Sequence, residues 1–198
     1  MKVLLAEDQA MIRTALAGLL RLESHYTVDE AVDGADAKQK LQESHYDILL
    51  TDIEMPHVSG LELLQWAKQA QPHLLTVIIT TFNRSGYIKR AIAAGVNGFL
   101  LKDAPIEVLV QSLQKIQTGQ QVISNELLLQ ALDDHDPLTD KERKALRLAG
   151  EGMSTAAIAE ALFIAEGTAR NYLSEAMSKL HASNRTEAAR IAHQKGWL

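Results

Sequence analysis

The sequence of 198 residues contains no cysteine, which excludes disulfide bonds and metal sites with thiolate ligands. It also has no run of about 18 apolar residues, the length that a membrane-spanning helix needs. Near the N-terminus, Glu7 and Asp8 bring acidic charge too early for a signal peptide. We therefore expect a cytoplasmic protein with no membrane partner.

The chain also lacks an excess of positive charge, since its formal net charge is −5 at pH 7. Overall acidity argues against a protein that coats nucleic acid. The charge is uneven, however: residues 137–198 hold nine Lys and Arg and seven Asp and Glu, whereas residues 1–136 hold 11 and 18. Because charge acts locally, this split is compatible with a small DNA-binding module at the C-terminus.

Apolar runs alternate with helical patterns over the first 120 residues. The runs cover 2–6, 47–51, 75–79 and 97–101, with a weaker run at 26–32, and the helical patterns cover 11–22, 34–43, 60–70, 85–94 and 105–118. Continuous apolar runs between helices are typical of strands in a buried parallel sheet. The pattern predicts a doubly wound α/β fold with a five-stranded parallel sheet.

Polar residues follow four of these runs, at the point where each predicted strand ends. Glu7 and Asp8 follow the first run, Asp52 follows Thr51 at the end of the next, and Thr80 and Lys102 follow the last two. Ligands of such sheets bind beyond the carboxyl ends of the strands, so we expect these side chains to share one pocket. Each residue alone would be an ordinary turn residue or surface charge; together they indicate a site.

The acidic residues of this pocket are suited to Mg²⁺. This ion prefers carboxylate and carbonyl oxygens and keeps several of its waters. Asp8 and Asp52 would be ligands, Glu7 would bond to a coordinated water, and the backbone carbonyl of Glu54 would complete the protein's share.

The same pocket is suited to a phosphoryl group. A carboxylate can attack phosphorus and form an aspartyl phosphate. The metal, the Lys102 ammonium and the Thr80 hydroxyl would together neutralise the charge of the transferred group.

Residues 1–120 resemble the receiver domain of two-component response regulators. The matching residues are Glu7-Asp8, Asp52-Ile53-Glu54-Met55-Pro56 with Gly60, Thr80 and Lys102. The resemblance implies a flavodoxin-like fold in which Asp52 accepts phosphate from a sensor histidine kinase. It also implies that Thr80 is the switch hydroxyl and Phe99 the switch aromatic, whose ring turns inward when Thr80 bonds to the phosphoryl group. Phe99 is equally well placed as an ordinary core residue.

Beyond the receiver pattern, residues 121–136 are less regular and end in a cluster of acidic residues before Pro137. This composition predicts a linker. Only helical patterns follow in residues 137–198, at about 139–149, 154–162, 166–180 and 185–194. A short helix followed by a longer one is typical of a helix-turn-helix, whose second helix enters the major groove of DNA.

Two capping signals mark the starts of these helices. Thr139 and Glu142 have the spacing of a capping box, and Ser154 has the position of an N-cap.

This small all-α region resembles the helix-turn-helix of the NarL/FixJ (LuxR-type) regulators. The match covers Leu138-Thr139 with Glu142, Ile158-Ala159 with Leu162, Gly167-Thr168-Ala169-Arg170, Lys179-Leu180 and Asn184-Arg185-Thr186-Glu187-Ala188. By position in the family, Arg170, Asn171 and Ser174 face base edges, and Arg and Asn can pair with guanine and adenine. The residues placed for phosphates are Thr168, Lys179 and Arg185. The alternative is that Arg170 and Lys179 are ordinary surface charges.

Three positions depart from the family pattern. Ala165 stands where Ser is usual, so the recognition helix lacks a side-chain cap worth about 1 kcal/mol. Ala169 replaces a usual Val, and Tyr172 replaces a usual His, which would alter a phosphate contact.

Three short segments resemble the subgroup that includes the thermosensor-linked regulators of fatty-acid desaturases (DesR-like). They are Arg170-Asn171-Tyr172, Gly196-Trp197, and Thr81-Phe82 with Gly86-Tyr87. In the family, positions 54 and 82 tune the lifetime of the phosphate, and the apolar Phe82 favours slow decay.

The family implies that phosphorylation promotes a homodimer, because two recognition helices on neighbouring half-sites of double-stranded promoter DNA need a twofold partner. The phosphorylated receiver would shift the population toward the dimer-competent state. Candidate dimer surfaces are Ile12, Leu16, Leu19, Leu109, Leu113 and Ile116 in the receiver and Ala188, Ile191 and Ala192 in the last helix. The alternative is that most of these residues are core.

Two other classes of function fit the sequence less well. Mg²⁺-dependent phosphatases or mutases that resemble haloacid dehalogenases carry a second Asp two residues after the nucleophile, where this chain has Glu54. A binding module without phosphorylation is disfavoured by the complete set of pocket residues. His57 and His135 show no metal-ligand spacing. We expect no enzyme activity apart from the receiver's own phosphotransfer and dephosphorylation.

Overall fold

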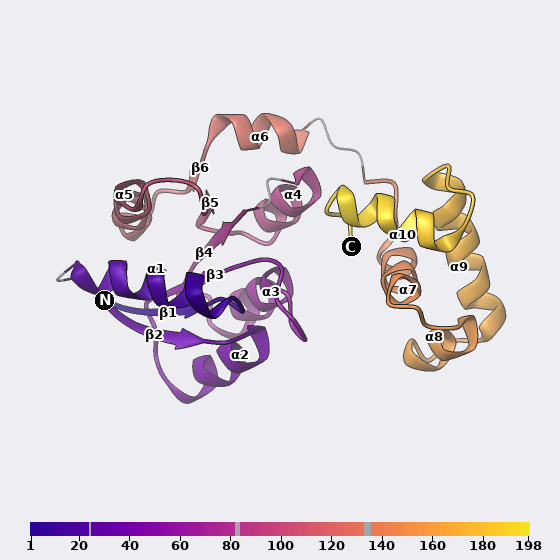
Figure 1. Cartoon of the computed structure of the whole chain (residues 1–198), viewed down its shortest axis with the longest axis horizontal. Coiled ribbons are helices and arrows are strands. Elements are labelled where there is room, and N and C mark those ends of the chain that lie inside the picture. Colours follow the sequence, from indigo (N-terminus) through magenta and orange to yellow (C-terminus); the bar gives the residue numbers. More distant parts are fainter. Residues whose placement is uncertain (24, 82–83, 133–135) are drawn as a thin grey trace. The chain divides into compact units, whose positions relative to one another are not determined.

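The structure, a computed structural model, describes the chain except residues 24, 82–83 and 133–135. It divides into two compact units, one formed by Met1–Asn83 with Tyr87–Ala131 and the other mainly by Leu132–Leu198 (Figure 1). Among the described residues, no helix combines the length and the apolar character that crossing a membrane requires. The predicted effect of Phe82 and the comment on His135 concern residues outside the described part.

The first unit contains a parallel sheet. Its strands are β1 (Lys2–Ala6), β2 (Thr27–Ala31), β3 (Ile48–Thr51), β4 (Leu75–Thr80), β5 (Gly98–Leu101) and β6 (Val122–Ile123), in the order β2-β1-β3-β4-β5-β6. The doubly wound parallel fold is confirmed, but the expected number of five strands is wrong, because β6 adds a sixth at the edge beside β5. Two residues are too short an apolar run to be recognised as a strand.

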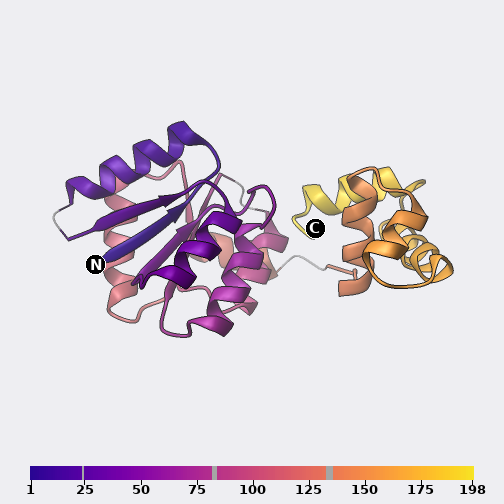
Figure 2. The same ribbon diagram turned by 90° about the horizontal axis from the view of Figure 1, so that it is seen from below.

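Helices cover both faces of this sheet (Figures 1 and 2). They are α1 (Ala10–Leu22), α2 (Gly34–Glu43), α3 (Gly60–Ala70), α4 (Ser85–Ala93) and α5 (Ile106–Gln117). Leu5 and Leu50 pack with α1 and α5 on one face, whereas Leu4 and Leu49 pack with α2 and α3 on the other. Both faces of the sheet are buried, which explains why the strands are continuous apolar runs.

Helix α6 (Asn125–Leu132) lies in the segment that we expected to be a linker. Leu127 and Ala131, each 5% exposed, pack in the same core cluster as Phe99 and Ile88 of α4. Spaced four residues apart, they lie on one face of the helix. The first unit therefore extends past residue 120 and includes β6 and most of α6, which lie within the expected linker.

The second unit contains α7 (Asp140–Gly150), α8 (Thr155–Ala161), α9 (Glu166–Lys179) and α10 (Arg185–Gln194). The predicted caps are confirmed: Thr139 and Glu142 form a capping box, and the Ser154 hydroxyl accepts a bond from the Ala157 backbone N–H. Ala165 has no side-chain bond at the start of α9, as expected. The four helices share one apolar core.

Candidate functional site

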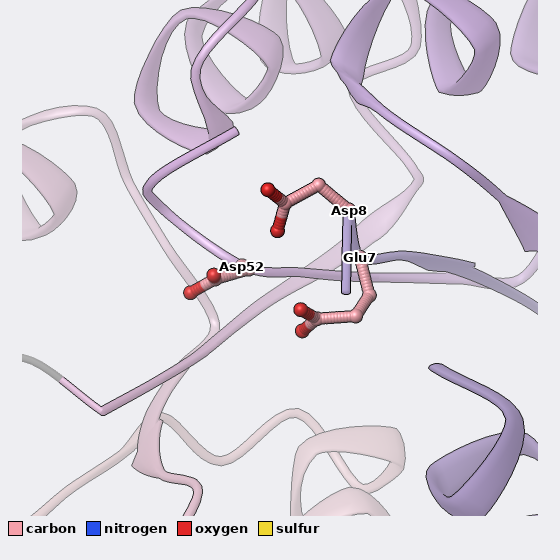
Figure 3. Close-up of side chains that lie close together, drawn as sticks. All are labelled: Glu7, Asp8 and Asp52. Carbon is pink, nitrogen blue, oxygen red and sulfur yellow. The ribbon is translucent and has the colours of Figure 1, made fainter. Parts of the chain in front are cut away.

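Three carboxylates gather where β1 and β3 end (Figure 3). Ala6 pairs with Thr51 in the sheet register, and the Asp52 backbone N–H donates to the Ala6 carbonyl at 3.0 Å. The residues that follow, Glu7, Asp8 and Asp52, therefore come side by side, with carboxylate oxygens within 4.8 Å of one another. The predicted acidic cluster is present in the structure.

Lys102 lies between two of these carboxylates. Its Nζ is 2.6 Å from Glu7 Oε2 and 3.0 Å from Asp52 Oδ2, and the side chains of Lys102, Glu7 and Asp52 are only 6%, 0% and 4% exposed. The Lys102 backbone N–H donates to the Thr80 carbonyl at 2.9 Å, which ties the end of β5 to the end of β4. The structure thus brings together side chains from three of the predicted strand ends.

The electrostatics of this cluster are unbalanced. Burial raises the pKa of the Glu7 carboxyl above its ordinary value, and Lys102 offsets this only in part. Burial acts to lower the pKa of Lys102, but the Glu7 and Asp52 carboxylates outweigh it and raise that pKa. The Lys102 ammonium pairs with two of the three carboxylates, and the nearby Arg13 guanidinium pairs with Glu30 instead, so the cluster carries excess negative charge.

Backbone contacts hold the acidic residues in place. The Arg13 guanidinium, on α1, donates to the backbone carbonyls of Glu7 at 2.6 Å and Asp8 at 3.3 Å. The Ile53 backbone N–H donates to Asp52 Oδ1 at 2.7 Å. Arg13 is not recognisable from the sequence, because one Arg in an amphipathic helix gives no signal that distinguishes it from a surface charge.

Gly60 allows a close backbone approach beside Asp52. A Cβ at this position would lie 1.8 Å from the Asp52 carbonyl oxygen, closer than any side chain tolerates. The Gly60 backbone N–H also donates to the Ile53 carbonyl at 2.9 Å. Any other residue would displace the loop that carries Asp52.

The two predicted switch residues lie in neighbouring strands. Thr80 ends β4 and is fully buried, while Phe99 in β5 is 1% exposed and packs in the cluster with Ile53 and Ile78. The register pairs Ile78 with Phe99 and Thr80 with Leu101. Phe99 is therefore a core residue in this structure, and its switching role stays a prediction.

Glu54 lies in the loop after β3 and is half-buried. The Tyr87 hydroxyl, from α4, donates to Glu54 Oε1 at 2.9 Å. We had noted Tyr87 only as part of a subgroup resemblance, since nothing in its spacing from Glu54 indicates a contact.

In the second unit, α9 exposes the predicted base-facing residues. Arg170, Asn171 and Ser174 are exposed, whereas Ala169 and Leu173 on the same helix are buried. Arg170 Nη2 lies 3.1 Å from Glu166 Oε1, an exposed ion pair one turn apart. Such pairs are weak in water, so Arg170 can exchange this partner.

The predicted phosphate-facing residues differ in their surroundings. Thr168 and Arg185 are half-buried, at the starts of α9 and α10. Lys179 Nζ bonds to both carboxylate oxygens of Glu142, at 2.9 and 2.8 Å. Burial acts to raise the pKa of Glu142, but Lys179 and the Thr139 backbone N–H outweigh it and lower that pKa. Lys179 thus joins α9 to the start of α7.

Most residues of the candidate dimer surfaces belong to the cores. Leu109, Leu113 and Ile116 lie on the buried face of α5, and Ala188 and Ala192 are buried in the second unit. The alternative interpretation holds for these residues. Leu19 is 40% exposed, and Met11 and Leu22 are also exposed large apolar residues of α1.

The family comparisons divide the chain in the same way. The model of the response regulator receiver domain matches residues 3–114, and that of the bacterial regulatory proteins of the luxR family matches residues 136–192.

Curated relatives cover the whole chain. It is 42% identical to the uncharacterized transcriptional regulatory protein YvfU of Bacillus subtilis (strain 168), over 100% of this chain and 99% of YvfU. It is 39% identical to the transcriptional regulatory protein DesR of the same organism, over 99% and 98%. The second likeness agrees with the subgroup resemblance.

Among solved structures, RcsB from Salmonella enterica serovar Typhimurium, bound to promoter rprA, matches with a TM-score of 0.73 and 23% identity over 96% of this chain and 97% of that chain. At this identity the likeness shows the fold alone. The two family models and the full-length relatives show more: the chain belongs to the NarL/FixJ family of response regulators, with a receiver domain and a LuxR-type DNA-binding domain that regulates transcription.

Proposed function

We propose that Asp52 accepts a phosphoryl group from a sensor histidine kinase and that this controls binding of the chain to promoter DNA. The observation that carries the proposal is the unbalanced cluster, in which Lys102 lies within 3.0 Å of two buried carboxylates and a third carboxylate is close by. Such a cluster suits a divalent cation and a phosphoryl group better than it suits a structural ion pair.

The donor set fits Mg²⁺, since all three side chains offer hard carboxylate oxygens that gather at one point. Asp8 and Asp52 would be ligands, Glu7 would bond to a coordinated water, and the backbone carbonyl of Glu54 would contribute. The ion, when bound, neutralises charge on the phosphoryl oxygens.

The protein's own groups then orient the reaction. The carboxylate of Asp52 attacks phosphorus as the bond between phosphorus and the histidine nitrogen of the kinase breaks and the imidazole leaves. The Lys102 ammonium and the Thr80 hydroxyl bond to the phosphoryl oxygens. We propose that Thr80 moves toward the phosphoryl group and that the Phe99 ring follows it, which favours a dimer-competent receiver. The chain is a switch in this account, and its chemistry is limited to its own phosphotransfer and dephosphorylation.

For DNA, we propose that α9 enters the major groove with Arg170, Asn171 and Ser174 toward base edges, and that Thr168 and Arg185 bind phosphates. Lys179 has three N–H donors, and two bonds to Glu142 leave one for a phosphate. Its main effect would be to fix α9. The proposed place of action is the cytoplasm, where promoter DNA is accessible.

Light scattering tests the switch. Wild type and Asp52→Ala would each be measured with and without Mg²⁺ and beryllofluoride, which mimics the phosphoryl group. We expect wild type, but not Asp52→Ala, to change from monomer to dimer, and only when both additions are present. Asp29→Ala is a matched control, because Asp29 is a carboxylate in β2 that bonds to Lys2 and Tyr46 instead of Lys102.

The test of DNA binding uses protein activated with Mg²⁺ and beryllofluoride. Activated wild type would first be used to select genomic fragments that it binds. The affinities of Arg170→Ala and Arg185→Ala for these fragments would then be measured at two salt concentrations. We expect Arg170→Ala to relax the sequence preference. Arg185→Ala should weaken binding to all fragments alike and lower the salt dependence of the affinity. If wild type does not bind beryllofluoride, that result contradicts the phosphoacceptor role of Asp52.

A further inference from the structure

Arg13 is a residue of α1 whose side chain contacts the backbone of two acidic residues of the cluster. Its Nη1 donates to the backbone carbonyl of Glu7 at 2.6 Å and to that of Asp8 at 3.3 Å. These residues belong to the short segment between the end of β1 and the start of α1. A guanidinium suits two successive carbonyls, because it carries several N–H donors in a rigid plane. The Arg13 side chain therefore fixes the path of the chain from β1 into α1.

The Arg13 guanidinium is itself held in place. Its side chain is only 13% exposed, and its Nε lies 3.6 Å from Glu30 Oε2. Glu30 belongs to β2, the neighbour of β1 in the sheet, and its other oxygen lies 3.0 Å from Arg21 Nη2. The charge of Arg13 is thus balanced by Glu30, while its Nη1 bonds to carbonyls. Arg13 acts on the acidic cluster through the backbone and not as a counter-ion.

Asp8 is the carboxylate of the cluster that depends most on its backbone. Glu7 and Asp52 both pair with Lys102, and each also accepts a hydrogen bond from a backbone N–H. Within the described part of the chain, the exposed Asp8 side chain has no such partner. It leaves the chain on the opposite side from the Glu7 side chain (Figure 3). The place of the Asp8 carboxylate is therefore set by the backbone that Arg13 holds.

A metal ligand of this kind benefits from a fixed backbone. An exposed carboxylate has to be immobilised when a cation binds, and this costs conformational entropy. The cost is lower when the backbone already holds the carboxylate near the other ligands. Groups that orient ligands without touching the metal typically contribute about 10- to 100-fold to metal affinity.

We propose that Arg13 is a positioning residue for the Mg²⁺ site, which holds the backbone of Glu7 and Asp8 so that the Asp8 carboxylate meets the ion beside Asp52. This inference rests on the proposed function of the cluster. It assigns to α1 a part in setting how much Mg²⁺ the receiver needs for phosphorylation.

The charge of Arg13 acts in the opposite direction to its positioning role. A guanidinium near the cluster repels a cation, so the removal of its charge would by itself tighten metal binding. The loss of its bonds to the two carbonyls should weaken metal binding. Arg13→Met keeps an apolar stem and removes both the charge and the donors. The direction of its effect therefore separates positioning from electrostatics.

The first measurement is metal binding by the full-length protein without a phosphoryl donor. Mn²⁺ takes the same kinds of oxygen ligand as Mg²⁺, and the free ion is counted by electron paramagnetic resonance. We expect the Kd of Arg13→Met for Mn²⁺ to be about tenfold higher than that of wild type.

Arg21→Met is the matched control for this titration. Arg21 is on the same helix, also pairs with Glu30, and also donates to a backbone carbonyl, that of Val28 at 2.7 Å. It lies about 12 Å further along α1. Its substitution should change the Kd by less than about twofold, because salt screens a charge at this distance.

The second measurement separates positioning from a general loss of structure. The rate of phosphorylation by phosphoramidate would be followed at increasing Mg²⁺ concentration. Arg13→Met should need about tenfold more Mg²⁺ to reach half of its maximal rate. Its maximal rate should equal that of wild type, because saturating Mg²⁺ offsets the weaker site. A partly unfolded receiver would lower the maximal rate instead.

Equal or tighter Mn²⁺ binding by Arg13→Met would overturn this inference and leave the proposed function intact. The same conclusion would follow if Arg21→Met weakened binding equally, or if Arg13→Met had a lower maximal rate at saturating Mg²⁺. If wild type itself binds no Mn²⁺, the proposed function fails first and the inference fails with it.

Discussion

Each unit of this protein has a lysine bonded to buried carboxylate, and the two lysines differ in the balance of charge around them. In the second unit, Lys179 bonds to both oxygens of Glu142, one cation to one anion. In the receiver, Lys102 is shared by Glu7 and Asp52, and Asp8 adds a third carboxylate. The first arrangement is complete as it stands, whereas the second has excess negative charge.

The pKa values follow this difference. Burial opposes the charged form of both buried acids, but Lys179 and Thr139 lower the pKa of Glu142, while Glu7 keeps a raised pKa despite Lys102. A balanced pair can hold two helices together, and an unbalanced cluster is suited to bind a cation. The charge count thus separates a structural ion pair from a candidate functional site.

The largest effect is expected for Lys102→Met without divalent metal. Glu7 is fully buried, and removal of its cation should destabilise the receiver by about 3 kcal/mol. The proposed Mg²⁺ site exists only in the native state, so the ion should restore part of this stability. Urea unfolding of the full chain, in Mg²⁺ and in EDTA, measures both. If Mg²⁺ has no effect on either wild type or Lys102→Met, the cluster does not bind this cation.

A buried apolar contact gives a reference without charge. Leu127→Ala, in α6, should lower the free energy of unfolding by about 3 kcal/mol, because a 5% exposed leucine leaves a cavity. Leu129→Ala on the same helix is the matched control, since Leu129 is 64% exposed, and should change stability by less than about 0.5 kcal/mol. Neither value should depend on Mg²⁺. Equal effects of both substitutions would show that α6 is not part of the receiver core.

Lys179→Met should lower the free energy of unfolding by a smaller amount, about 2 kcal/mol, because the Lys179 side chain of this ion pair is one-third exposed. The loss belongs to the DNA-binding unit and should be the same in Mg²⁺ and in EDTA. Unfolding of the full chain followed by circular dichroism measures it, with Lys141→Met as a control on the exposed side of α7. A loss of stability that differs between Mg²⁺ and EDTA would contradict the proposed difference between Lys179 and Lys102.

The pH dependence should differ in sign between the two sites. Glu142 has a lowered pKa, so its stabilising contribution is present above its ordinary value of 4.5 and is lost as the pH falls through the lowered pKa. Glu7 has a raised pKa, so in EDTA its protonation favours folding, and this contribution is lost as the pH rises through that pKa. The measurement is the unfolding free energy of wild type, Glu142→Gln and Glu7→Gln from neutral pH to about pH 3, so that the range extends below the ordinary pKa of a glutamate. Parallel curves for both variants would contradict these directions.

The elements with strong periodicity were predictable from the sequence. Continuous apolar runs and helical patterns predicted β1 to β5 and α1 to α5 within one or two residues, and capping residues predicted the starts of α7 and α8. The signal fails for β6, which has two residues, and for α6, whose buried positions are only Leu127 and Ala131 among those described. Both elements depend on tertiary packing against β5 and α4.

The cluster of Glu7, Asp8, Asp52 and Lys102 was predictable for a different reason. Topology places the ends of parallel strands at one edge, so Glu7, Asp52 and Lys102 come together without any detail of packing. Contacts from side chains in helices gave no such signal. Arg13 and Tyr87 reach the same region through positions on α1 and α4 that look like ordinary helix positions. The pairing of Lys179 with Glu142 likewise joins residues far apart in the sequence.

The most direct test of the central claim, that the unbalanced cluster is a phosphorylation site, is intact-mass spectrometry. Wild type and Asp52→Asn would be incubated with phosphoramidate in Mg²⁺ or in EDTA, with Asp29→Asn as a control. We predict that wild type and Asp29→Asn gain one phosphoryl group in Mg²⁺ only, and that Asp52→Asn gains none. A phosphoryl group on Asp52→Asn, or none on wild type in Mg²⁺, would contradict the account.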